Sequence, residues 1–220
     1  MSATVVGRER RTRRPDLLRW FGLVCIAAGF VLLAQFAYGM WQGYADGQRL
    51  NRVWQEQASL TPAPPVGVQG IDPALKRPLD GVDFQIRVPK LGYAAAVKEG
   101  VDSTVLYSSP GHYPETPWPG DPGMVGVAAH NVYWIDFPQL QPGDQVLLQT
   151  RYGTYTYRVT GSRIVNPDDR TVLIPTAPGY HLTLTTCWPT WAGAFATQRY
   201  IIFTDQVSPP PPSQQSLRTG

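Results

Sequence analysis

The sequence predicts an all-β domain, a barrel or sandwich with little helix, that follows one N-terminal transmembrane helix. Three observations carry this prediction. One uncharged, apolar run covers residues 20–41. Beyond residue 80, short strand-like runs alternate with turn residues, and no helical period is sustained. The stretch that holds these runs, residues 81–207, has an ordinary size for one domain.

The apolar run, WFGLVCIAAGFVLLAQFAYGMW, has the length needed to cross a hydrocarbon core of roughly 30 Å. Six arginines precede or border it within residues 1–19, against one glutamate and one aspartate, which predicts that this flank is cytoplasmic. Trp20 and Trp41 stand at its two ends, as interfacial aromatics do. A cleaved signal peptide is the alternative, but no A-x-A cleavage site follows the run. We therefore expect an uncleaved signal anchor, with everything after it outside the cytoplasm.

Charge is distributed unevenly between this anchor and the remainder. Residues 1–41 hold 6 basic and 2 acidic side chains, a net charge of +4, which leaves 13 basic and 14 acidic side chains beyond them, a net charge of −1. The basicity therefore belongs to the anchor and suits an anionic inner leaflet. It gives no support to nucleic-acid binding.

Two segments flank the β-domain. Residues 42–80 are polar and then proline-rich, ending in TPAPPVGVQGIDPALKRPLD, and predict an extracytoplasmic stalk or linker rather than core. Residues 208–220, SPPPPSQQSLRTG, predict an extended or disordered tail.

The strands of the domain are predicted from runs rich in β-branched and aromatic residues. In chain order they are FQIRVP, MVGVAA, QVLLQT, YTYRVTG, HLTLTTC and QRYIIF. Turn residues separate them, as in PWPGDPG, QPGD and APGY, and IDFPQL could form one turn of helix.

One cysteine ends a predicted strand. In TLTTCWP, Thr183, Thr185 and Cys187 share one face, and Pro189 stops the strand. The other cysteine, Cys25, lies in the apolar run and cannot reach Cys187, so Cys187 is an unpaired exported thiol. Such a thiol is a buried apolar residue, an intermolecular crosslinker or a nucleophile.

Histidine is the usual partner of a catalytic thiol. His181 is in the same strand as Cys187, six residues and roughly 20 Å away, too far to touch it. His130 ends a strand with small neighbours, and His112 lies in a loop that could reach a groove. Arg199 begins an apolar strand and could supply the cation that a reacting carbonyl oxygen needs.

These motifs resemble the sortases, the cysteine transpeptidases of bacterial surfaces. TLTTC, an arginine that opens an apolar strand, and an upstream AAHN occur in the family's order, and the resemblance covers most of residues 83–204. Ala129 stands where many members have glycine. The interval of 12 between Cys187 and Arg199, with WPTWAG inside it, is most similar to class D; class E members usually have a shorter interval.

The resemblance implies a sortase-like closed β-barrel with short helices. It implies Cys187 as nucleophile, His130 as general acid and Arg199 as the donor to the substrate and its oxyanion. It further implies cleavage of an LPxTG-like sorting signal on a surface protein through a thioacyl-enzyme, and transfer to an amine of a cell-wall precursor or a pilin lysine. No cofactor is expected. The expected location is the bacterial cell membrane, single-pass, with an extracytoplasmic catalytic domain.

Four residues are candidates for substrate binding: Thr186, Trp188, Trp191 and His112. The segment from Trp188 to Thr197 joins the strands of Cys187 and Arg199, and its apolar area suits an extended Leu-Pro-type ligand. Alternatively, these aromatics only pack the loop onto the barrel.

Two other functions stay open. A pilin-polymerising sortase is disfavoured because no second C-terminal membrane helix follows and because Ala74, in IDPALK, lacks the ring of an aspartate-proline-aromatic lid. A non-catalytic anchored β-domain could bind a cell-surface polymer through Trp134, Trp188 and Trp191. No metal is expected: Asp168 and Asp169 are adjacent at a turn, and there is no Cys/His ligand spacing.

Overall fold

The structure, a computed structural model, describes residues 17–60 and 72–211. The chain forms two compact units, divided between Trp41 and Gln42. The helix α1 (Leu17–Leu60) contains the predicted apolar run and is long and apolar enough to cross a membrane. The basic segment up to residue 16 lies outside the described residues, as does the tail from residue 212.

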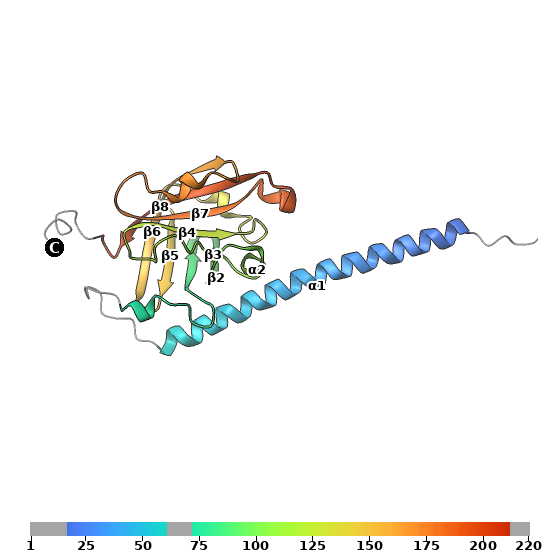
Figure 1. Cartoon of the computed structure of the whole chain (residues 1–220), viewed down its shortest axis with the longest axis horizontal. Coiled ribbons are helices and arrows are strands. Elements are labelled where there is room, and N and C mark those ends of the chain that lie inside the picture. The colour runs from blue at the N-terminus through green and yellow to red at the C-terminus, as the bar shows by residue number, and fades with distance from the viewer. Residues whose placement is uncertain (1–16, 61–71, 212–220) are drawn as a thin grey trace, which may run out of the picture. The chain divides into compact units, whose positions relative to one another are not determined.

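Eight strands close into a barrel in the order β1-β2-β3-β4-β7-β8-β6-β5, which confirms the predicted fold class (Figure 1). They are β1 (Phe84–Val88), β2 (Tyr93–Glu99), β3 (Gly111–His112), β4 (Gly123–Ala129), β5 (Gln145–Thr150), β6 (Gly153–Val165), β7 (Tyr180–Trp188) and β8 (Gln198–Ser208). Within residues 72–211, helix is confined to α2 (Ser103–Leu106) and to 3-10 turns at Pro73–Leu75, Pro89–Leu91, Phe137–Gln139, Arg170–Leu173 and Thr190–Phe195.

All six predicted runs form strands, and two strands were not predicted. The sequence of β2, YAAAVKE, has three alanines, which have low β propensity, and β3 is only two residues long. Both depend on tertiary pairing: residues 93–97 of β2 pair with β1, and β3 pairs with both β2 and β4. The barrel interior is filled by alternating apolar side chains, among them Phe84, Ile86 and Leu184.

Residues 42–60 do not form the stalk that their polarity suggested. They continue α1, and Trp54 is buried at 2% exposure within the main apolar core. Leu50 packs against the same core. These two apolar side chains are four positions apart and therefore share a helix face, but the polar residues around them mask the pattern. Residues 61–71 lie outside the described residues.

Candidate active site

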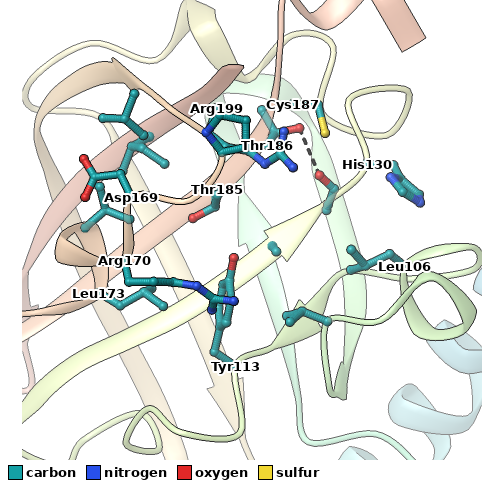
Figure 2. A pocket seen from close by; sticks show the side chains of 17 residues that line it. Leu106, Tyr113, His130, Asp169, Arg170, Leu173, Thr185, Thr186, Cys187 and Arg199 are labelled. Carbon is teal, nitrogen blue, oxygen red and sulfur yellow. Dashed lines mark hydrogen bonds between the residues drawn. The ribbon is translucent and has the colours of Figure 1, made fainter. Parts of the chain in front are cut away.

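Three neighbouring strands bring the predicted catalytic residues together. β4 runs parallel to β7 with Ala129 opposite Thr186, so His130, at the end of β4, comes beside Cys187. β7 runs antiparallel to β8 with Cys187 directly opposite Arg199. The register thus joins residues 57 and 12 positions apart along the chain. In the view of Figure 2, the Cys187 side chain lies between those of His130 and Arg199.

These residues line a cavity of about 260 Å³. Its walls come from four parts of the barrel: the segment around α2, the loop after β3, the ends of β4, β7 and β8, and the β6–β7 connection. The remaining lining residues are Val101, Leu106, Tyr113, Ala128, Ala129, Val165, Pro167, Asp169, Arg170, Val172, Leu173, Thr185, Thr186 and Ile201. Cys187 is half-buried, so its thiol is accessible from this cavity.

A glycine in β4 permits the close packing of two cavity walls. A Cβ on Gly126 would lie 2.8 Å from Tyr113 Cδ2 and 2.9 Å from Leu173 Cδ2, closer than real Cβ contacts. Tyr113 follows β3, and Leu173 belongs to the 3-10 turn before β7. Gly126 therefore lets these two side chains pack closely against β4 in the wall of the cavity.

The turn after β4 holds the backbone of His130. Its carbonyl oxygen accepts hydrogen bonds from the Tyr133 N–H at 3.0 Å and the Trp134 N–H at 3.2 Å. Trp134 is buried and stacks on Phe137, with ring centroids 4.2 Å apart. This packing fixes Trp134 in the barrel as a core residue, which leaves the ring unavailable to a surface polymer.

Burial lowers the pKa of His130, and the nearby Arg199 charge lowers it further. The neutral imidazole is therefore favoured near pH 7, and it can accept the thiol proton. Arg199 is half-buried and donates from Nη1 to the Gln198 carbonyl oxygen at 3.1 Å. Within residues 17–60 and 72–211, no carboxylate forms an ion pair with Arg199, so its charge is available to a bound substrate.

The pKa of His130 can be measured directly. We expect an NMR titration of the folded chain to give a pKa below the ordinary histidine value, and Arg199→Gln to raise it because one of the two lowering effects is removed. Arg158→Gln, on exposed β6 surface, is the control. An unchanged His130 pKa in Arg199→Gln would show that the two charges do not interact.

Thr185 is a cavity residue that the sequence analysis did not select. Its hydroxyl is buried and lies near the Tyr113 side chain, but in the described part of the chain it forms no hydrogen bond of ordinary geometry. Burial also raises the pKa of Tyr113, an effect that Thr185 and the charges of Arg170 and Arg199 partly offset. The strand alternation already placed Thr185 on the face of Cys187, so this signal could have identified it.

Thr186, which was selected, lines the cavity but uses its hydroxyl elsewhere. Thr186 Oγ1 donates to the Ala129 carbonyl oxygen at 2.9 Å, the dashed line in Figure 2. This bond ties the end of β7 to the end of β4. The structure thus supports a role for Thr186 in aligning Cys187 with His130.

The two selected tryptophans of the β7–β8 loop do not line the cavity. Trp188 packs on Tyr200, with ring centroids 5.3 Å apart, and Trp191 is 81% exposed. The loop is held by Asn131, whose Nδ2 donates to the Gly193 carbonyl oxygen at 3.2 Å. It is therefore tied to the turn of His130, with Trp191 free to meet a ligand that extends beyond the cavity.

His112 does not lie at the cavity, contrary to its selection as a groove residue. It is 1% exposed, and its Nδ1 lies 3.2 Å from Asp83 Oδ2. Its Nε2 lies 3.1 Å from both the Pro117 carbonyl oxygen and Thr116 Oγ1. Because Asp83 is 29 residues earlier in the chain, sequence inspection did not reveal this buried pair.

Replacement of His112 should affect stability more than catalysis. His112→Ala leaves the buried Asp83 carboxylate without its partner, and we expect the free energy of unfolding to fall by about 3 kcal/mol. Urea unfolding would measure this, and kcat/KM at low temperature should change far less than the roughly 10²–10⁴-fold typical of losing a general acid or base. Unchanged stability with a catalytic-scale loss of activity would contradict this assignment.

Residues 72–76, the described part of the segment compared above with a lid, are held away from the site. Arg151 Nη2 contacts the carbonyl oxygens of Ala74, Leu75 and Arg77 at 3.0, 3.1 and 2.7 Å. None of these residues lines the cavity.

Asp169 lines the cavity, and its carboxylate accepts a hydrogen bond from the Thr171 N–H at 3.0 Å. The described residues contain no cluster of three or more His, Cys, Asp or Glu that could hold a metal.

The chain is similar to known sortases in sequence. The sortase domain family matches residues 86–207. Sortase D of Bacillus subtilis is 30% identical over 124 residues, which cover 56% of this chain and 63% of that protein. Sortase SrtE1 of Streptomyces coelicolor is 25% identical over 237 positions, covering 97% of this chain and 65% of the relative. The chain thus spans less than two thirds of either relative, and Sortase D, the more similar of these two, agrees with the predicted resemblance to class D.

Solved structures show the same barrel. Sortase E from Streptomyces avermitilis is 30% identical, with a TM-score of 0.53, and the match covers 60% of this chain and 91% of that one. A Clostridium perfringens Sortase D5 transpeptidase has a TM-score of 0.60 at 20% identity, covering 74% and 99% of the two chains. The second likeness is one of fold alone.

Proposed function

Because the chain belongs to the sortase family, we propose that it is a membrane-anchored cysteine transpeptidase whose reaction takes place in the cavity of Cys187. One observation carries the proposal. The registers of β4, β7 and β8 bring the Cys187 thiol beside a histidine of lowered pKa and an arginine that forms no ion pair with any carboxylate among the described residues. These are the groups that acyl transfer through a thiol requires.

In the first half of the reaction, His130 accepts the Cys187 proton and the thiolate attacks the carbonyl carbon of the scissile amide. The carbonyl oxygen becomes an oxyanion, which the Arg199 guanidinium stabilises by hydrogen bonds and charge. The His130 imidazolium then protonates the leaving nitrogen as the C–N bond breaks. A thioester on Cys187 and a free amine result.

In the second half, an incoming amine attacks the thioester carbon. His130 accepts a proton from this amine, and the Cys187 thiolate leaves as the new amide forms. The net change is exchange of one amide for another, so the reaction needs no ATP. Hydrolysis follows instead when water reaches the thioester first.

We propose a surface protein with an LPxTG-like sorting signal as the substrate. Apolar side chains such as Leu106 and Leu173 line the cavity and suit the aliphatic part of an extended peptide. Among the described residues the buried Thr185 hydroxyl forms no hydrogen bond of ordinary geometry, so it suits a peptide N–H or C=O, because a buried hydroxyl is costly without such a bond. Trp191 can extend this contact along the β7–β8 loop. The proposed acceptor is an amine of a cell-wall precursor or a pilin lysine.

The proposed location is the bacterial cell membrane, with α1 as a single-pass anchor and the barrel outside the cytoplasm. The arginines before the apolar helix support this orientation. We expect a protease added to intact protoplasts to remove the barrel and leave a short N-terminal fragment. Recovery of a mature chain that starts near residue 38, or complete protection of the barrel, would contradict this topology.

The function can be tested with the full chain in detergent. It is incubated with LPxTG-type peptides and with either a glycine-type amine, a diaminopimelate-type amine or a lysine side-chain amine. We expect a ligated product whose mass equals the N-terminal peptide fragment joined to one of these amines. A preference for the lysine side chain would favour pilus polymerisation over wall anchoring. Neither cleavage nor ligation across a library of signal variants would contradict transpeptidase function.

A further inference from the structure

Two glycines bring the C-terminal part of α1 against a loop of the barrel. A Cβ on Gly43 would lie 2.7 Å from the Tyr107 carbonyl oxygen, and one on Gly47 would lie 2.8 Å from the Ser108 carbonyl oxygen. Real Cβ atoms do not approach backbone this closely, so a larger residue would displace either the helix or the loop. The glycines are four positions apart and therefore share one face of the helix.

On the same helix face, four positions further along, Asn51 covers an open strand edge. Its Oδ1 accepts the Ala96 N–H at 2.6 Å, and its Nδ2 donates to the Ala94 carbonyl oxygen at 3.5 Å. Residues two apart in a strand direct their backbone groups to the same edge, and β3 pairs with β2 only at Lys98 and Glu99. The Asn51 carboxamide therefore takes the place of a neighbouring strand.

The loop that the glycines contact also reaches the active site. Tyr107 directly follows Leu106, which lines the cavity. The Tyr107 carbonyl oxygen, next to Gly43, accepts a hydrogen bond from the Tyr133 hydroxyl. Tyr133 in turn donates its N–H to the His130 carbonyl oxygen at 3.0 Å. A continuous set of contacts thus runs from the helix, through one loop carbonyl, to the turn that carries His130.

We propose that Gly43, Gly47 and Asn51 are positioning residues for the reaction, because the helix segment 43–51 fixes the loop on which the His130 turn rests. This inference builds on the proposed function. It gives the polar part of α1 a catalytic purpose beyond connecting the barrel to its anchor: if the helix is displaced, the Tyr107 carbonyl moves, and the His130 turn loses its support.

The test uses the full chain in detergent and the variant Gly47→Ala, with Gly29→Ala as the matched control because its Cβ would meet no atom within 4 Å. Alanine favours helix over glycine, so a loss cannot come from a weaker helix. We expect Gly47→Ala to lower kcat about tenfold with a smaller change in KM. Amide exchange of residues 130–134 should become about tenfold faster, while the amides of β6 and β8 are unchanged.

Tyr133→Phe is the second variant, because it removes only the hydroxyl that bonds to the Tyr107 carbonyl oxygen, and it keeps the inference testable if Gly47→Ala does not fold. We expect the same loss in kcat and the same faster exchange, and little further loss in the double variant, because both changes act through one loop. Unchanged exchange of residues 130–134 in either variant would overturn the inference, whatever the activity. If the variants show faster amide exchange of residues 130–134 but the wild-type chain transfers no peptide, the proposed function is rejected, whereas the coupling between the helix and the His130 turn stands.

Discussion

Cys187→Ala should abolish both peptide cleavage and transfer. Cys187 is the one thiol at the cavity, and no neighbouring group can form a thioester in its place. The lining hydroxyls of Thr185 and Thr186 are poorer nucleophiles, and the latter is already bonded to a carbonyl oxygen. We expect kcat/KM to fall below detection, whereas the melting temperature should change little because Cys187 is only half-buried.

The matched control is Cys25→Ala, which removes the other thiol of the chain from the apolar helix. It should keep full activity. Product release by Cys187→Ala at more than background level would show that the acyl group is carried elsewhere. Loss of activity in Cys25→Ala alone would show that the assay depends on the anchor rather than on the site.

Arg199→Lys should lower kcat/KM by about 10²–10³-fold, the effect of removing one oxyanion donor. Arg199 lies directly opposite Cys187 in the β7–β8 pair, and in the proposed mechanism its guanidinium stabilises the oxygen of the carbonyl that the thiol attacks. Lysine keeps the charge but loses the planar fork that can contact two oxygens at once. The effect should appear in the rate of acyl-enzyme formation, measured by rapid quench with excess enzyme.

Arg158→Lys, at an exposed position of β6, provides the control for an Arg-to-Lys change on this barrel and should retain wild-type rates. His130→Ala should be nearly as severe as Cys187→Ala, because both proton transfers depend on it. If Arg199→Lys acylated as fast as wild type, charge alone would suffice and the bidentate role would be wrong.

The strands that carry the chemistry were predictable because they depend on local sequence. The run HLTLTTC alternates, ends at a proline and forms β7; QRYIIF forms the start of β8. The family resemblance implied that His130, Cys187 and Arg199 act together, but the pairing of β7 with both β4 and β8 could not be derived from composition. The register of paired strands is a tertiary property. Only the structure shows that Cys187 lies opposite Arg199, and that Ala129 lies opposite Thr186, the residue before Cys187.

The errors have one physical cause: contacts between distant residues override local signals. Polar neighbours hid Trp54, so the docked helix was read as a stalk. Asp83 is far from His112 in sequence, so a buried pair was read as a groove residue. Thr186 was selected and Thr185 was not, although strand alternation places Thr185 on the same face as Cys187 and both threonines line the cavity.

The central claim is that Cys187 carries the substrate as a thioester, and intact-mass spectrometry of the full chain tests it most directly. The chain is mixed with LPxTG-type peptides without an amine acceptor, quenched in acid and digested. We expect a mass increase equal to the N-terminal peptide fragment, located on the peptide that contains Cys187, lost on addition of hydroxylamine and absent from Cys187→Ala. Ligation of peptide to amine with no such adduct, or with an adduct on any other residue, would contradict the account.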